Sequence, residues 1–317
     1  MLTLQKFIEK INSRTGFTGF LAYDEPMSRH TTFRAGGPAD LFIRPEGEGF
    51  PAYAALLRES AGTEGIPLFI LGGGANILVS DRGLRGVVLD TGGWRGAVAE
   101  ASGLLVRSGT PVDEAVEAAA AAGLGGLEFL AGMPGTIGGA VWMNARCYDR
   151  SVSDVLKETE ILDEAGARRW IPARPEDFGY KKSPFQGQRA LIFSARFALT
   201  PRPEAEIRRE MEEHRRDREA KGHYRYPSAG SVFKNNRAFG KPTGKLIDEL
   251  GLRGLAIGGA MIAPWHGNII INTGNARASE IRALTEETAA RVKAALGFTL
   301  EPEILFAGDW GEGGSEE

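Results

Sequence analysis

Apolar residues along this chain recur with two different periods, and the two periods predict a mixture of helices and strands. An amphipathic helix is predicted over residues 1–20, where apolar side chains recur at helical spacing: Leu4, Phe7, Ile8 and Ile11. Short unbroken apolar runs predict buried strands at 40–43, 67–71 and 86–90, with a helix at 50–60. This alternation is typical of a small α/β domain.

The rest of the chain continues as a mixture of helices and strands. Thr110 and Pro111 predict a helix start, with Thr as N-cap and Pro in the first turn, and Gly123 predicts its end. Pro201-Arg202-Pro203 indicates a domain boundary. The other expected strands are 158–162, 191–197, 231–233, 255–262, 269–272 and 300–306, and the other expected helices are 204–221, 244–250 and 277–296.

The predicted helix 204–221 is highly charged. Glu204 and Arg208, and Glu212 and Arg216, are four residues apart, so each pair can form an ion pair on one face. We interpret this helix as a solvated, ion-paired surface helix rather than a nucleic-acid-binding element.

Composition narrows the class of protein. A length of 317 residues predicts two or three domains, and the net charge of −3 gives no general attraction to nucleic acid or to an anionic membrane. Cys147 is the only cysteine, which excludes an internal disulfide and a Cys-based zinc site. The N-terminus lacks the apolar core of a signal peptide, and no run approaches a membrane span. We therefore expect a cytoplasmic protein.

The 43 glycines are the unusual feature, and two loops concentrate them, at 71–79 and 132–140. Glycine lets successive backbone N–H groups turn toward one point, which creates a nest for phosphate oxygens, although either loop alone could be an ordinary turn. Residues 240–246 resemble a Walker A loop but are one residue short and end in leucine, and 72–77 lacks the last glycine of the Rossmann fingerprint. We therefore predict a bound diphosphate outside both of those folds.

A separate polar cluster lies in Ser228-Ala-Gly-Ser-Val-Phe-Lys-Asn235. Ser231 offers a proton, Lys234 a cation and Asn235 an amide, although the serine could be a turn residue and the lysine could be solvated. His30 and His266 lack the spacing of metal ligands, so we expect hydrogen-bonding roles for them and no metal site.

Several of these motifs occur in one order that resembles a known family. The segments that carry the resemblance are 29–39, 71–79, 132–144, 178–180, 228–235, 244–248, 266–268 and 302–304. From about residue 20 to 307 the chain resembles the UDP-N-acetylenolpyruvoylglucosamine reductase (MurB) family, in its shorter-loop subclass. The resemblance implies an α+β fold, with a two-subdomain FAD-binding module of the vanillyl-alcohol-oxidase type and an α/β substrate-binding lobe. The implied boundaries are 1–90 with 299–307, 91–203 and 204–298, followed by a flexible tail at 308–317.

The resemblance also implies an activity. NADPH would reduce a noncovalently held FAD, and UDP-GlcNAc-enolpyruvate would then be reduced to UDP-N-acetylmuramate for peptidoglycan synthesis, with no protein partner required. Ser231 matches the family's proton donor, Glu303 its catalytic glutamate, and Tyr180, Lys234 and Asn235 match substrate-binding positions. The positions implied for FAD are Gly72, Gly73, Gly74, Ala75, Asn76, Ile77, Gly132, Pro134, Gly135, Thr136, Gly138, Gly139, Ala140 and Asn144.

The chain departs from the family pattern in two places. Tyr180-Lys-Lys-Ser183 stands where the family usually has Tyr-Arg-x-Ser, so Lys181 occupies the arginine position. Lysine keeps the charge but loses the planar fork that binds a carboxylate. Either Lys181 stabilises the developing charge, or Lys182 or another cation does. Arg146 replaces a more usual glycine. Two alternative functions stay open. One is a flavin oxidase or dehydrogenase with the same cofactor fold and another substrate, and the other is an inactive homologue that binds a sugar nucleotide or flavin.

Overall fold

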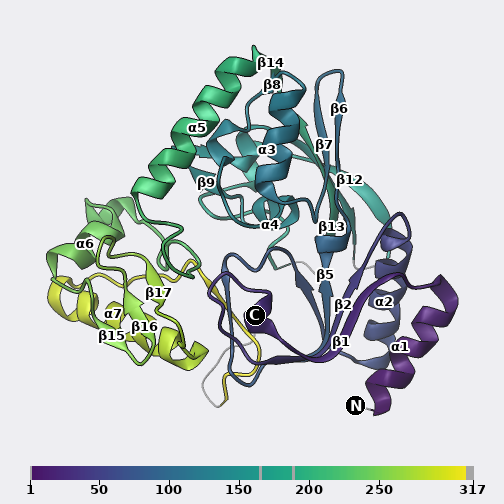
Figure 1. The fold of residues 1–317 in the computed structure, drawn as a ribbon, viewed down its shortest axis with the longest axis horizontal. Coiled ribbons are helices and arrows are strands. Elements are labelled where there is room, and N and C mark those ends of the chain that lie inside the picture. The colour runs from purple at the N-terminus through teal and green to yellow at the C-terminus, as the bar shows by residue number, and fades with distance from the viewer. Residues whose placement is uncertain (1, 164–165, 188–189, 312–317) are drawn as a thin grey trace. The chain divides into compact units, whose positions relative to one another are not determined.

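The computed structural model describes residues 2–163, 166–187 and 190–311, and the chain forms two compact units. Unit 1 comprises residues 1–23, 41–73 and 86–217, and unit 2 comprises 24–40, 74–85 and 218–317. Figure 1 labels the elements of both units. The expected boundaries at 90/91 and 203/204 stay a prediction, and residues 312–317 of the expected tail lie outside the described residues.

The larger sheet of unit 1 is antiparallel throughout, with strand order β12-β11-β13-β7-β6. Its strands are β6 (Ala97–Glu100), β7 (Gly103–Arg107), β11 (Leu156–Leu162), β12 (Arg168–Pro172) and β13 (Leu191–Ala198). The predicted strands at 158–162 and 191–197 are confirmed. We did not predict β6 and β12, because both lie at sheet edges, are largely exposed and lack an apolar run.

The second sheet has the order β1-β2-β5-β3, in which β3 and β5 are parallel. Its strands are β1 (Gly19–Pro26), β2 (Pro38–Pro45), β3 (Leu68–Leu71) and β5 (Leu84–Asp90), and the accompanying helices are α1 (Leu2–Thr15) and α2 (Phe50–Glu64). The predicted first helix was too long: the chain leaves the helix at Gly16, which has φ +65°, and then forms β1. Phe7, Ile8 and Ile11 of α1 are buried in one core cluster with Phe50 and Leu57 of α2.

Helix α3 (Val112–Ala121) ends as predicted but begins differently. Pro111 occupies the N-cap position and no side chain caps the helix, so the prediction of Thr110 as N-cap was wrong. The Thr110 hydroxyl instead accepts a hydrogen bond from Gly96 N (2.9 Å) and donates to Gly96 O (3.1 Å), which ties the loop before β6. Gly123 follows the helix at φ +65°, as a C-terminal stop requires.

Helix α5 (Glu204–Ala220) has the predicted ion-paired surface. Arg208 bonds to Glu204 at 2.7 Å and Arg216 to Glu212 at 2.8 Å. A surface pair of this kind contributes only a few tenths of a kcal/mol. This face of the helix is therefore solvated and ion-paired, as the charge pattern predicted.

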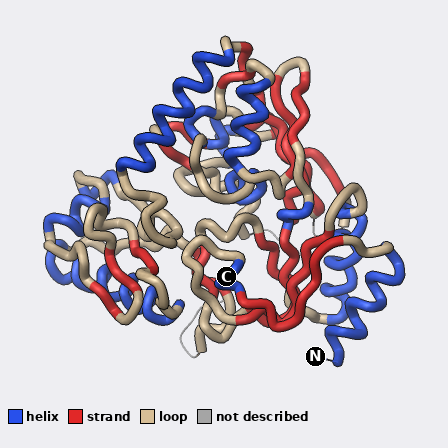
Figure 2. The backbone as a smooth tube through the Cα atoms, in the orientation of Figure 1, coloured by secondary structure: helices blue, strands red, loops and turns tan. Residues whose placement is uncertain are grey.

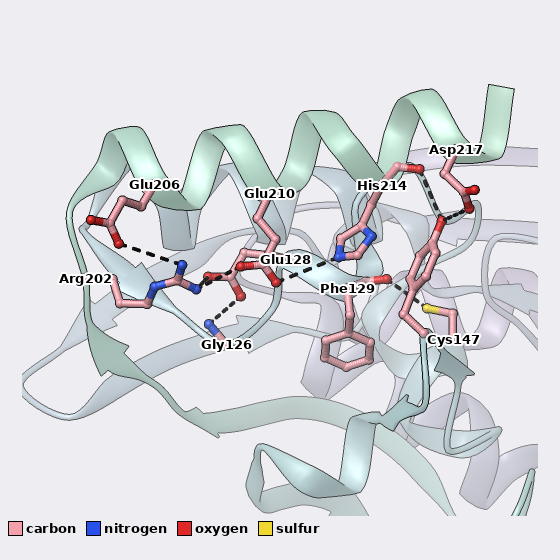
Figure 3. Close-up of polar contacts among 10 residues, drawn as sticks. Gly126, Glu128, Phe129, Cys147, Arg202, Glu206, Glu210, His214 and Asp217 are labelled. Carbon is pink, nitrogen blue, oxygen red and sulfur yellow. Dashed lines mark hydrogen bonds and ion pairs between the residues drawn. The ribbon is translucent and has the colours of Figure 1, made fainter. Parts of the chain in front are cut away.

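The other face of α5 makes contacts that the charge pattern did not reveal (Figure 3). Arg202, just before the helix, pairs with Glu128 at 2.8 Å, and the Glu128 side chain is only 1% exposed. Farther along, the Tyr148 hydroxyl donates to Asp217 at 2.8 Å, while its ring stacks on His214 with centroids 4.0 Å apart. These contacts attach α5 to the rest of unit 1 as far as Asp217.

The short elements of unit 1 complete it. They are β8 (Leu124–Gly125), α4 (Ile137–Trp142), β9 (Arg146–Cys147), β10 (Arg150–Ser151) and β14 (Thr200–Pro201). Helix α4 packs against β13 and β7, beside α3 (Figure 1). Its N-terminal residues belong to the second glycine loop, so the loop is carried by the core of unit 1.

In its described residues, unit 2 contains the α-helices α6 and α7, short strands and long loops, which Figure 2 colours by type. Its elements are β4 (Ile77–Val79), α6 (Thr243–Glu249), β15 (Ala256–Ile257), β16 (Ala260–Ile262), β17 (Ile270–Asn272), α7 (Ala278–Leu296) and β18 (Leu305–Ala307). Strands β15, β16 and β17 form an antiparallel sheet, and β18 pairs in parallel with β4.

Three predicted strands of unit 2 needed correction. Residues 255–262 form the hairpin β15-β16 because Gly258 and Gly259 turn the chain between its halves. Residues 231–233 make isolated bridges, Ser231 with Ile269 and Phe233 with Pro302, rather than a continuous strand. Only the end of the predicted strand 300–306 enters a sheet, as β18.

Candidate functional site

In unit 1 the two glycine loops lie against one another. A Cβ added to Gly72 would lie 2.7 Å from the Thr136 hydroxyl, and one added to Gly73 would lie 2.6 Å from Gly135 Cα. At Gly73 no side chain fits without moving backbone, whereas at Gly72 the Thr136 side chain would have to move. Gly73 therefore needs glycine because of a backbone-to-backbone approach, and the role of this loop toward a phosphate stays a prediction.

Beside this approach lie two buried hydroxyls without partners. Among the described residues, Ser108 Oγ and Thr136 Oγ1 are both buried and make no hydrogen bond within the protein. Gly138 N donates to Ser108 O at 2.8 Å, so Ser108 belongs to the wall of the second loop. Unpaired buried hydroxyls cost free energy, and a phosphate oxygen would accept from them. Thr136 was among the cofactor positions predicted from the sequence, but Ser108 was not. The only signal for Ser108 was that a serine and a glycine follow the end of a strand.

The remaining predicted positions of the second loop differ in exposure. Gly132 has φ +73° and donates its N–H to Asp113 at 2.8 Å, which anchors the loop to α3. Pro134 and Gly139 are exposed, whereas Gly138 and Ala140 are buried in α4. The exposed members thus form the outer surface of the loop, and the buried ones its packed side.

The second part of the first loop, residues 74–79, belongs to unit 2. Gly74 has φ +60° and a Cβ there would collide with the carbonyl oxygen of His30. Ala75 is half-buried, and Ile77 begins β4. Asn76 donates through its amide to Glu303 O at 3.0 Å and accepts at its own carbonyl from Leu305 N at 2.9 Å. Asn76 therefore holds the segment of the predicted catalytic glutamate.

The same segment pairs with the one that carries Ser231. Glu303 N donates to Val232 O at 2.7 Å, and Lys234 N donates to Glu301 O at 2.9 Å. Glu303 is 8% exposed and Ser231 is half-buried. The structure thus brings Ser231 and Glu303 onto neighbouring backbone segments, although they are 72 positions apart in the sequence.

Asn268, to which the motifs gave no separate role, fixes this segment from its other side. It is 3% exposed, and its side-chain oxygen accepts from Phe233 N at 2.9 Å while its amide donates to Phe233 O at 2.8 Å. Its backbone carbonyl also accepts from Val232 N at 2.9 Å. The signal in the sequence was a single asparagine before the short apolar run 269–271, which alone is weak.

Lys234 and Asn235 project from the same segment and already have partners. Lys234 Nζ pairs with Glu301 at 2.5 Å, and the Glu301 side chain is 70% exposed, as expected for a solvated carboxylate. Asn235 accepts from Thr243 N at 2.9 Å, which connects the segment to α6. A role for either residue in holding substrate stays a prediction.

The two histidines make hydrogen bonds, as predicted. His266 Nδ1 accepts from Asn268 N at 3.1 Å, and His30 Nε2 lies 2.9 Å from Glu25. Burial lowers the pKa of His266, and Lys221 and Arg253 lower it further against the opposing effect of Asp248. His266 is therefore neutral at neutral pH.

The predicted lysine lies in a turn of unit 1. Gly179 and Lys182 exchange backbone hydrogen bonds of 3.0 and 3.1 Å around Tyr180 and Lys181. Tyr180 is 44% exposed, and Lys181 has φ +56°, a region that non-glycine residues seldom adopt. Lys182 is exposed at the turn. Lys181 is thus the lysine that this turn holds in a defined, strained backbone conformation.

Asn144 and Arg146 follow α4. Asn144 is 2% exposed, donates to Gly179 O at 2.9 Å and accepts from Ser153 N at 3.0 Å. Its predicted role toward the cofactor stays a prediction, but these bonds tie it to the lysine turn. Arg146 donates to Ser151 Oγ at 3.2 Å and pairs with Asp149 at 3.1 Å, so it closes its own hairpin.

Comparison with known proteins defines the class first. Residues 53–171 match the family model of an FAD binding domain, and residues 222–307 match that of the C-terminal domain of UDP-N-acetylenolpyruvoylglucosamine reductase. The first match contains all of both glycine loops, 71–79 and 132–140, and the orphaned hydroxyls fit the diphosphate of that cofactor. The fold is an α+β FAD-binding module with an additional lobe, as in the solved structure of the family; the expected vanillyl-alcohol-oxidase type of this module stays a prediction.

Relatives of the whole chain define the family. The UDP-N-acetylenolpyruvoylglucosamine reductase of Treponema denticola is 43% identical over 310 residues, which cover 92% of this chain and 95% of that protein. The same enzyme of Borreliella burgdorferi is 37% identical, covering 96% and 98%. The crystal structure of the Thermus caldophilus enzyme (MurB) has a TM-score of 0.73 at 35% identity, covering 92% and 99%. The chain belongs to the UDP-N-acetylenolpyruvoylglucosamine reductase family.

Proposed function

We propose that this protein reduces UDP-GlcNAc-enolpyruvate to UDP-N-acetylmuramate for peptidoglycan synthesis, with FAD as cofactor and NADPH as reductant. The observation that carries the proposal is the backbone pairing that places Glu303 against the segment of Ser231 within unit 2. Membership of the family supplies the activity to which these residues correspond.

The glycine loops would hold the cofactor. Gly72, Gly73, Gly135 and Thr136 surround the backbone approach, and Ser108 adds a second free hydroxyl beside it. FAD, when bound, takes a hydride from NADPH and gives it to the terminal vinyl carbon of the substrate. The loops need to orient the cofactor and exclude bulk water, which closely packed backbone does without side-chain motion.

Ser231 would supply the proton. A hydride added to the vinyl carbon leaves negative charge on the neighbouring carbon and its carboxylate. The Ser231 hydroxyl donates its proton to that carbon and is reprotonated by solvent. Ser231 is half-buried, which limits the access of competing water. The hydrogen bonds between Asn268 and Phe233 keep the Ser231 segment in place. General acid catalysis of this kind contributes about 100-fold to 10,000-fold.

Glu303 and Lys181 would stabilise the charge that develops on the carboxylate. With substrate bound, Glu303 would donate a hydrogen bond to this carboxylate, and Lys181 would act as a point charge in place of the family arginine. Tyr180, Lys234 and Asn235 would bind the substrate. The Lys234–Glu301 pair is mostly exposed and can open to release the ammonium for a diphosphate, because exposed pairs are weak.

Location and partners follow from the substrates. NADPH and a nucleotide sugar are cytoplasmic metabolites, so we propose that the protein acts in the cytoplasm without a required protein partner. Among the described residues, no helix is both long enough and apolar enough to cross a membrane.

Anaerobic stopped-flow mixing tests the activity. NADPH should bleach the flavin absorbance of the holoprotein, and subsequent UDP-GlcNAc-enolpyruvate should restore it. Bleaching without restoration would indicate a protein that has lost the activity or acts on another substrate. A colourless preparation that cannot be reconstituted with FAD would contradict the proposal as a whole.

A further inference from the structure

The lysine turn is attached to the C-terminal end of α4 by side chains. The Gln186 amide nitrogen donates to Trp142 O at 3.1 Å and to Lys181 O at 3.1 Å. The Ser183 hydroxyl donates to the same Trp142 carbonyl at 2.6 Å. Trp142 is the last residue of α4, and the final carbonyls of a helix have no partner within it. Residues of the turn therefore satisfy the end of the helix.

Asn144 holds the opposite side of the turn. Its amide donates to Gly179 O at 2.9 Å, the residue that also pairs with Lys182. Asn144 itself has φ +43° and is 2% exposed, so its position is fixed by the surrounding structure. Gln186 and Asn144 together form what we call the amide clamp.

The geometry of the clamp favours one backbone conformation of Lys181. A left-handed conformation costs a non-glycine residue about 1 kcal/mol or more, so it persists only where neighbours hold it. The Gln186 amide has two N–H groups, and both are used on backbone carbonyls, one in the helix and one in Lys181 itself. Loss of these bonds would let the turn relax without removing any charge.

The helix that receives the clamp also carries the cofactor loop. Thr136, Gly138 and Gly139 lie at or within the first turn of α4, and Trp142 ends it. One short rigid element thus joins the phosphate-binding residues to the lysine turn. We propose that Gln186 and Asn144 are positioning residues: they hold Lys181 in place. Through Lys181 they set the rate at which the reduced flavin reduces the substrate. This rests on the proposed role of Lys181.

A double-mutant cycle tests the proposal in the holoenzyme. Gln186→Leu should slow the substrate-driven return of flavin absorbance about 10-fold, because the lysine is present but misplaced. In a Lys181→Ala background, Gln186→Leu should change this rate less than 2-fold. FAD content and the rate of bleaching by NADPH should stay as in the wild type. Gln5→Leu, the same exchange on an exposed face of α1, is the matched control and should change nothing.

A second readout does not depend on turnover. In apo-protein carrying Gln186→Leu, amide hydrogens over residues 179–186 should exchange with solvent faster, while those of α3 should not. Should Gln186→Leu prevent folding, Gln186→Glu keeps the size of the side chain and replaces the donor nitrogen, so the same cycle applies.

The possible failures are distinguishable. Equal slowing in both backgrounds, or an unchanged rate with Gln186→Leu, would overturn the positioning role. A Lys181→Ala variant with wild-type kinetics would overturn it by removing Lys181 from the mechanism, while leaving the proposed activity intact. An absent second phase in the wild type would instead contradict the activity itself.

Discussion

The two units hold their functional residues in different ways. In unit 2, Ser231 and Glu303 lie on segments joined by backbone hydrogen bonds, with Asn268 bonding to both the N–H and the carbonyl of Phe233. In unit 1, the turn of Lys181 is attached to α4 by side chains, Gln186, Ser183 and Asn144. Backbone pairing survives most side-chain replacements, whereas a side-chain bond is lost with one substitution.

This difference explains where the chain could depart from the family pattern. The segment 228–235, which carries part of the resemblance, is held mainly by backbone bonds that do not depend on its side chains. The lysine turn replaces the family arginine and still has a complete set of backbone and side-chain bonds. The turn thus holds Lys181 in one backbone conformation, and the catalytic role of this lysine stays a prediction.

The largest effect should follow from breaking the backbone approach in unit 1. Gly73→Ala would put a Cβ 2.6 Å from Gly135 Cα, and overpacking of this kind costs about 1–3 kcal/mol. The variant should lose bound FAD, measured by flavin absorbance per protein after gel filtration. Gly62→Ala, in α2 with open space around it, is the control and should keep the cofactor. Full FAD content in Gly73→Ala would contradict the cradle.

A somewhat smaller effect should follow from removing the side chain that supports unit 2. Asn268→Ala leaves the buried N–H and carbonyl of Phe233 without their partners, which should cost about 2 kcal/mol in the free energy of unfolding. Urea unfolding measures this cost. Asn236→Ala, at an exposed turn of unit 2, should cost less than half as much. Equal costs would mean that backbone pairing alone holds the Ser231 segment.

The smallest effect concerns a charge at the start of α7 in unit 2. Burial alone would raise the pKa of Asp81, but hydrogen bonds from Ser279 and the N–H of Ala278, together with Arg277, lower it. A lowered pKa adds stability above the ordinary aspartate value, and this stability disappears as pH falls below about 4. Because Asp81 is largely exposed, solvent screens its charge, and Asp81→Asn should therefore cost no more than about 0.5 kcal/mol at pH 7 and progressively less in acid.

The measurement for Asp81 is urea unfolding of wild type and variant from pH 7 to pH 3. Asp149→Asn, whose side chain is fully exposed, serves as the control and should show no comparable convergence. If the difference in the free energy of unfolding between Asp81→Asn and wild type stayed constant down to pH 3, the assigned role of the carboxylate charge would be contradicted.

The sequence revealed much of the fold because its buried elements are apolar. Strands such as β5 and β13 and the helix α7 follow directly from their periodicity, whereas exposed edge strands such as β12 have no such signal. The bridges of Ser231 with Ile269 and of Phe233 with Pro302 could not be predicted from the sequence, because the paired residues are far apart along the chain.

The site was predictable to a similar extent. Gly73, whose Cβ would collide with the Gly135 backbone, was among the predicted positions because glycines are concentrated in this loop, although the loop alone could have been an ordinary turn. Ser108 and Gln186 were not predicted from the sequence. The proposed role of Ser108 follows from a hydroxyl without a hydrogen-bond partner, and that of Gln186 from a side chain that bonds to a helix end. Such roles depend on tertiary distances that no local pattern records.

The central claim is that Ser231 gives a proton to the reduced substrate carbon. Its most direct test compares Ser231→Ala with Ser228→Ala, the same change three residues away, in anaerobic stopped-flow mixing. The account predicts that both variants bind FAD and are bleached by NADPH at the wild-type rate. Return of flavin absorbance on addition of UDP-GlcNAc-enolpyruvate should then be at least about 100-fold slower in Ser231→Ala alone. Equal return rates in the two variants would contradict the account.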